Sequence, residues 1–241
     1  MRENPAIVWE MYQSLEKEFL NILEYVPLTS NHYEVWSYPL VNLFTNIGSS
    51  IDSFFKNAIY CQSLDNFPEI KNTRSLENHN MGIYRDIFEK RYKISNKEIF
   101  DLKNFSPISP NYSPIYPFAS WKNNFTPDWW EKYTKIKHDR FRNKEQATLK
   151  STIDALAGLF ALFLTHPETL DVLIDRDVII SGGHPKAYTK EILSHPEPIT
   201  EMVNRIYSKT SLFGYVFEIH GYPNDDESKI KVLSPSYLGY G

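Results

Sequence analysis

Apolar residues recur every three or four positions along several long segments of this 241-residue chain. That spacing places them on one face of an α-helix, so it predicts helices over residues 5–26, 36–61 and 81–92. A further helix, expected to begin near Asn143, carries an apolar stripe from 149 to 164 with small residues between, which indicates a buried position. The predicted fold class is mainly α, a helical bundle.

Proline interrupts the helical pattern between residues 105 and 118, where Ser-Pro occurs three times. Such a segment cannot be helical, and either a flexible linker or an ordered strap over the core fits it. Interleaved aromatic and aliphatic side chains favour the strap, because a solvated linker has no use for them. We expect residues 1–165 to form the bundle and 166–241 a loop-rich extension packed on the same domain, with little β-structure. A helix over 199–207 and a short strand over 214–219 are predicted there.

A basic run, WWEKYTKIKHDRFR, occupies residues 129–142, on a helix predicted to start with Thr126 as N-cap and Pro127 in its first turn. Residues 131–150 hold seven Lys or Arg against three acids, a local charge of +4, whereas the whole chain carries −4. A positive surface on an acidic chain suggests an anionic partner. The run is therefore the main functional candidate.

His138 lies in the middle of this run. On a continuous helix, Lys135, His138, Asp139 and Arg142 would share one face. Neighbouring cations favour the neutral imidazole, which can accept a proton, while Lys and Arg can hold a phosphate. These groups suit cleavage of RNA by its own 2′-hydroxyl without a metal. The alternative is a solvated basic helix face with an incidental histidine.

The segments around WSYPLVNLFTNIGSSIDSFFK, and the pairing of PFASW with WWEKYTKIKHDR and an Ala/Leu/Phe-rich helix, resemble bacterial HEPN-type helical proteins. The resemblance covers roughly residues 9–60 and 117–164. It implies a bundle that commonly forms homodimers, and often a metal-independent ribonuclease of abortive-infection or toxin–antitoxin systems. The family places an Arg a few residues before its His; here Lys132 stands at that separation from His138, and the literal match, Arg74 to His79, lies in a polar segment.

The resemblance also implies roles for individual side chains. His138 would be the acid or base, Arg140 or Lys137 would contact phosphate, and Asp52 would orient a side chain. Asp52 and Lys56 could equally form a surface ion pair across one helical turn. The remaining candidate nucleic-acid contacts are Lys132, Lys135, Arg142, Lys144 and Lys56.

Other patterns limit the alternatives. No secretory signal is visible, and the single cysteine fits a reducing compartment, so a cytoplasmic protein without membrane contact is expected. The three His-Pro pairs match no metal-ligand spacing, and no cofactor or metal is expected. A homodimer, RNA, and an antitoxin or defence-system protein are the candidate partners. The competing hypothesis to the ribonuclease is a non-catalytic helical module that binds protein or nucleic acid through its basic surface.

Overall fold

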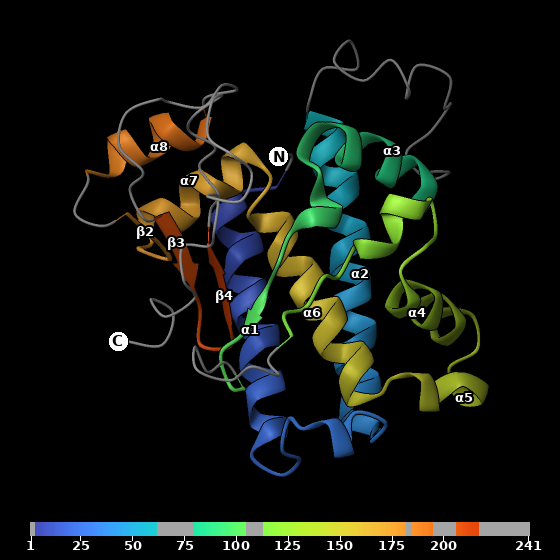
Figure 1. The fold of residues 1–241 in the computed structure, drawn as a ribbon. Coiled ribbons are helices and arrows are strands. Elements are labelled where there is room, and N and C mark those ends of the chain that lie inside the picture. The colour runs from blue at the N-terminus through green and yellow to red at the C-terminus, as the bar shows by residue number, and fades with distance from the viewer. Residues whose placement is uncertain (1–2, 62–79, 105–112, 182–184, 195–205, 217–241) are drawn as a thin grey trace.

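The computed structural model describes residues 3–61, 80–104, 113–181, 185–194 and 206–216, and these are mainly helical (Figure 1). This confirms the mainly α class. The α-helices are α1 (Pro5–Leu23), α2 (Tyr38–Cys61), α3 (Met81–Tyr92), α4 (Asp128–His138), α5 (Arg140–Asn143), α6 (Leu149–Phe163), α7 (Pro167–Asp175) and α8 (Lys186–Ser194). Short 3-10 helices cover η1 (Ser30–His32), η5 (Ile94–Asn96), η6 (Ala119–Asn123) and η7 (Lys144–Gln146).

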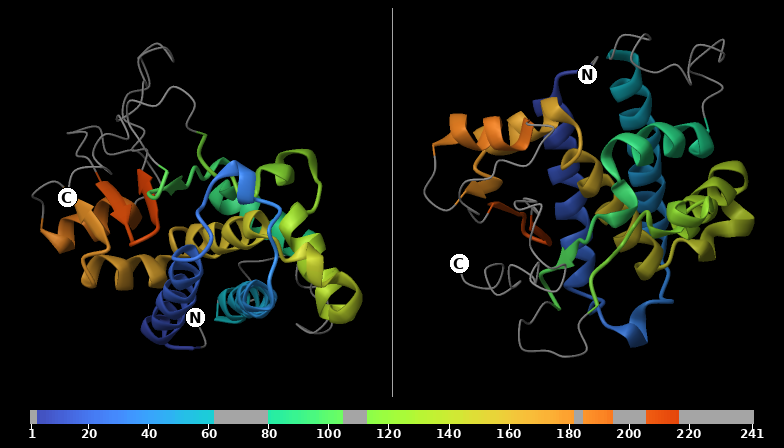
Figure 2. Two further views of the ribbon diagram at one scale, coloured as in Figure 1. Left: turned by 90° about the horizontal axis from the view of Figure 1, so that it is seen from below. Right: turned by 45° about the horizontal axis from the view of Figure 1, so that its top comes forward.

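The centre of the fold is α6, which packs against both α1 and α2 (Figures 1 and 2). Every residue of α6 is buried except Lys150 and Asp154, as its apolar composition predicts. The helix begins later than the predicted start near Asn143, because η7 intervenes and Thr148 is the N-cap. No single helix in the described ranges is long and apolar enough to cross a membrane; α6 and α7 pass together by length and composition but bend by 93°.

Helix α4 lies against α2 and α6 through its aromatic residues. Tyr133 covers Gly48 so closely that a Cβ atom added at Gly48 would lie 2.2 Å from the ring carbon Cδ2. Trp129 covers Gly158 of α6 and donates from Nε1 to the carbonyl of Pro117 at 2.7 Å. The aromatic half of the basic run thus fixes the position of α4.

The proline-rich segment is an ordered strap over residues 113–118, whereas 105–112 lie outside the described residues. Ile115 pairs with Ile99 through two backbone hydrogen bonds of 2.8 and 2.9 Å. Phe118 is fully buried against Trp121 and Trp129. Phe118 of the strap therefore belongs to the core and Ile115 packs against it, whereas Tyr116 is 43% exposed.

A small antiparallel sheet covers the other side of the bundle, in the order β1-β4-β3-β2. Its strands are β1 (Phe100–Asp101), β2 (Ile179–Ser181), β3 (Ile206–Lys209) and β4 (Phe213–Val216). The predicted helix over 199–207 is wrong at its end, since Ile206 and Tyr207 belong to β3, and 199–205 lie outside the described residues. Strand β4 overlaps the strand expected over 214–219.

Glu16 joins this sheet to α1. It is buried, and its carboxylate accepts hydrogen bonds from the hydroxyls of Tyr12 and Thr210 and from the backbone amide of Leu212 at 3.2 Å. Burial raises the pKa of Glu16. A single carboxylate thus replaces water for one donor on its own helix and for two that lie 194 and 196 residues further along the chain.

Candidate nucleic-acid interface

The basic run is divided into two helices rather than one. Helix α4 ends at His138, and Asp139 adopts an extended backbone with φ −149° and ψ 88°. The Asp139 side chain accepts from the amide of Arg142 at 3.1 Å and so caps α5. The prediction that Lys135, His138, Asp139 and Arg142 share one helix face is therefore wrong, because Asp139 serves as a cap and redirects the chain.

At the end of α4, Lys135, Lys137 and His138 are exposed. The ammonium of Lys137 lies 5.8 Å from the ring centroid of Tyr133. A contact with a ring does not neutralise the charge, and Lys137 is exposed, so the charge is accessible to a partner. The His138 ring makes no hydrogen bond or ion pair within the described residues, so its position depends on its helix alone.

Two contacts attach α5 and η7 to the start of α2. The guanidinium of Arg140 donates to the side-chain oxygen of Asn42. Lys144 donates to the carbonyl of Phe141 at 3.4 Å, and its Nζ lies 5.8 Å from the ring centroid of Trp36. Asn42 and Trp36 were not among the predicted site residues, and no local spacing could have indicated them, because they lie about 100 positions away in the chain.

We call the cationic surface formed by these residues the α5 patch. Its members are Lys135, Lys137, Arg140, Arg142 and Lys144. Residues 135–145 hold these five cations and two acids, Asp139 and Glu145, a formal charge of +3. Arg142 pairs with Asp139 at 3.5 Å, whereas the other four cations have no acidic partner in the described part of the chain. The α5 patch lies at the end of the α4–α5 segment, which forms one side of the bundle (Figure 1).

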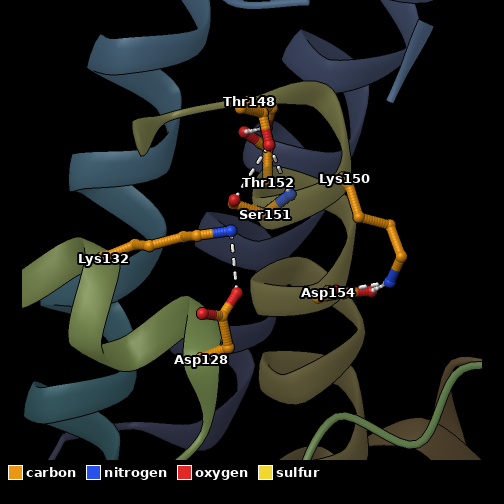
Figure 3. Close-up of polar contacts among 7 residues, drawn as sticks. All are labelled: Asp128, Lys132, Thr148, Lys150, Ser151, Thr152 and Asp154. Atoms are coloured by element: carbon orange, nitrogen blue, oxygen red, sulfur yellow. Dashed lines mark hydrogen bonds and ion pairs between the residues drawn. The ribbon is translucent and has the colours of Figure 1, made fainter. Parts of the chain in front are cut away.

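Lys132 does not belong to this patch. Its ammonium pairs with Asp128 at 2.7 Å, one turn earlier on α4, and the pair faces α6 (Figure 3). Lys150 pairs in the same way with Asp154 at 2.5 Å. Burial raises the pKa of Asp154, and Lys150 and Lys132 oppose that rise. The structure gives Lys132 an acidic partner between two helices, and its role as a nucleic-acid contact stays a prediction.

Figure 3 also shows how α6 begins beside this charge cluster. Thr148 accepts from the amide of Ser151 at 3.2 Å, and the two hydroxyl oxygens are 2.9 Å apart. The Thr152 hydroxyl donates to the carbonyl of Thr148 at 2.8 Å. The three buried hydroxyls thus find hydrogen-bond partners within the first turn of α6, so their role is to stabilise the start of this helix.

Asp52 and Lys56 also lie apart from the α5 patch. Asp52 accepts from Lys56 at 2.7 Å and, across to α3, from the Tyr84 hydroxyl at 3.1 Å. Asp52 is ten residues along α2 from Asn42, which contacts Arg140, so about 15 Å of helix axis separates them. The structure does not bring Asp52 together with Arg140, and the alternative of an ion pair across one turn describes Asp52 and Lys56 better.

Asp52 instead influences the tyrosines around it. Burial, with the nearby Asp52 charge, raises the pKa of Tyr133 to about 12. The same two causes raise the pKa of Tyr84, so both hydroxyls stay protonated at neutral pH. Asp52 therefore acts as an acceptor that links α2 to α3.

The literal Arg-to-His match at 74–79 falls outside the described residues. Within the described ranges, no group of three His, Cys, Asp or Glu side chains could hold a metal ion. No family model, no curated protein and no solved structure matches this chain.

Proposed function

We propose that this chain binds nucleic acid, in the first place RNA, through the α5 patch. One observation carries the proposal: four exposed or half-exposed cations without acidic partners are gathered at one helix end of an acidic protein. Surface cations are ordinarily dispersed among acids, as Lys132 and Lys150 are here.

The charge distribution also sets the orientation of a bound polyanion. With +3 in residues 135–145 and −4 overall, the rest of the chain carries −7. A phosphate backbone is attracted to the patch and repelled elsewhere, so binding should be local and strongly salt-dependent. Arg140 also contacts Asn42 of α2, and Lys144 contacts Phe141 and the ring of Trp36, which lowers the entropy lost when they order on a phosphate.

The test compares the wild-type chain with the double variant Lys137→Glu/Arg140→Glu by fluorescence anisotropy on a labelled RNA over a salt series. We expect at least ten-fold weaker binding and a shallower dependence of log K on log salt, by about one unit per lost phosphate contact. Lys17→Glu/Lys122→Glu makes the same charge change at exposed lysines outside the patch and should leave the salt slope in place. Equal effects of the two double variants would exclude the patch as the binding surface.

A second function, metal-independent RNA cleavage in defence or growth arrest, is supported by His138. Its ring is exposed beside Lys137 and Arg140, where it could take the 2′-hydroxyl proton while the cations hold the phosphate. The HEPN resemblance adds a homodimer in which two copies of His138 face one cleft, with an antitoxin or defence-system protein as a further partner. Incubation of RNA with the wild type or with His138→Ala, both in EDTA, separates the two functions. Cleavage that requires His138 supports the nuclease, whereas RNA binding without cleavage supports the binding module alone.

A further inference from the structure

The α5 patch carries an aromatic side chain that folding does not explain. Phe141, between Arg140 and Arg142, is 88% exposed, more than the other exposed large apolar side chains in the described residues. Water contact with a whole phenyl ring is unfavourable, and a surface selected only for charge has no use for it. The ring stands where α5 turns away from α4, so it is held on a defined backbone.

A second exposed ring lies next to the same surface. Tyr38 is 66% exposed and is one helical turn before Asn42, the residue that accepts from Arg140. Residues four apart on a helix are neighbours on its face, so Tyr38 and Arg140 belong to one continuous surface. The ring of Trp36 meets that of Tyr38 edge to face, with 5.8 Å between their centroids, and Trp36 also lies 5.8 Å from Nζ of Lys144.

Aromatic faces interleaved with exposed cations are the combination that single-stranded nucleic acids require. Cations follow the phosphates, and unstacked bases lie on aromatic rings, whereas a duplex keeps its bases stacked inside and offers only its backbone. We propose that the α5 patch is specific for single strands, with Phe141 as the main platform for a base and Tyr38 as a second one. This inference rests on the proposed nucleic-acid binding and adds the class of substrate to it.

Protein docking is the competing use of an exposed ring, and charge separates the two. Phe141 is bordered by cations on both sides, whereas apolar patches that bind proteins are depleted of charge at their centre. A nucleotide strand offers both a flat base for the ring and backbone phosphates for the neighbouring arginines. The local charge therefore favours a nucleotide strand.

The test measures affinities of the full chain for three probes of about 12 units: oligo(U), oligo(dT) and an RNA duplex. The wild type should bind the single strands more tightly than the duplex. Phe141→Ala should weaken single-strand binding by about ten-fold and duplex binding by less than about two-fold, because only a stacked base is lost. Phe141→Tyr should retain the preference, whereas Phe141→Leu, which keeps an apolar side chain without a π-face, should behave like Phe141→Ala.

Phe125 provides the matched control, because it is 68% exposed at the opposite end of α4. Phe125→Ala should change no affinity, and circular dichroism confirms that each variant is folded. Two results overturn the inference while the proposed function stands. One is salt-dependent binding with equal affinity for single strands and duplex. The other is a Phe141→Leu variant that binds single strands as tightly as the wild type. If the wild type binds none of the probes, the proposed function fails and the inference with it. Where the single strands do bind, a preference between oligo(U) and oligo(dT) identifies RNA or DNA as the strand.

Discussion

Gly48 gives the sharpest test of how the aromatic residues fix α4 on the bundle. It lies inside α2, where Gly→Ala ordinarily stabilises a helix by about 1 kcal/mol. Here the added Cβ would lie 2.2 Å from Cδ2 of Tyr133 and 2.5 Å from both Cγ and Cε2. These ring atoms are close to the backbone of a buried residue, so the whole of α4 must shift.

We therefore expect Gly48→Ala to be destabilising. The clash should cost about 3 kcal/mol, at the upper end of overpacking, and the helix-propensity gain offsets about 1 kcal/mol of it. A net loss of about 2 kcal/mol corresponds to a fall of several degrees in Tm for a chain of this size. Urea denaturation followed by circular dichroism measures the loss directly.

The sign of the effect should reverse when the ring is absent. In a Tyr133→Ala background the Cβ at position 48 no longer meets its three nearest neighbours, which are all atoms of the Tyr133 ring, so Gly48→Ala should now stabilise by about 1 kcal/mol. Tyr133→Ala alone costs about 3–5 kcal/mol, so the cycle is measured at low temperature, where this variant is still folded. If Gly48→Ala stabilises the wild type, or has the same sign in both backgrounds, the close packing of Tyr133 on Gly48 is refuted.

Three further predictions concern buried polar groups and the cap of α5. His166 is 2% exposed, and burial lowers its pKa from 6.5 to about 4. The neutral imidazole therefore contributes stability above pH 6.5, and the free energy of unfolding should fall by about 3 kcal/mol between pH 6.5 and pH 4. His166→Leu should remove this fall, as measured by urea titrations at both pH values. Glu16 has a raised pKa, so its contribution to stability is full below the ordinary pKa of 4.5 and is lost as pH rises through the raised value. Glu16→Gln, which keeps an acceptor, should flatten the dependence of Tm on pH in thermal melts between pH 4 and 8. An unchanged dependence would show that another group titrates. Asp139→Ala removes the cap of α5, so it should lower the free energy of unfolding by about 1 kcal/mol. It should also weaken RNA binding, because Arg140 loses its fixed position. Asp139→Asn still caps the helix and is the control, and equal losses in both variants would contradict a capping role.

Helices could be predicted wherever one periodic stripe dominated. The segment 81–92 forms α3 at the predicted residues, and α2 begins two residues inside its predicted range. The break at Asp139 was missed because the surrounding residues form helices well, and only the capping bond to Arg142 distinguishes Asp139 from a helical residue. The start of α6 was placed too early for a related reason: Asn143 and Gln146 imitate a cap, while the capping side chain is Thr148.

The candidate site shows the same division between local and distant contacts. Asp128 precedes Lys132 by four residues, and Lys150 precedes Asp154 by four, so both ion pairs could have been read from the spacing. Because Asp128 and Asp154 pair with Lys132 and Lys150, fewer cations are unpaired than the charge of +4 over residues 131–150 indicates. The partners of Arg140 and Lys144 offer no such signal, because Asn42 and Trp36 lie about 100 positions away in the chain and meet them only in the folded structure.

The helical class and the buried central helix follow from the spacing of apolar residues along the chain, and the local excess of positive charge follows from a count of charged residues. The partners of the cations, the separation of Asp52 from Arg140 and the exposure of Phe141 emerge in the folded chain alone. A side chain is available to a partner only where its neighbours in space leave it uncovered. Those neighbours are set by the packing of α4 on α2 and α6 and by the contact of Arg140 with Asn42, which join residues far apart in the chain.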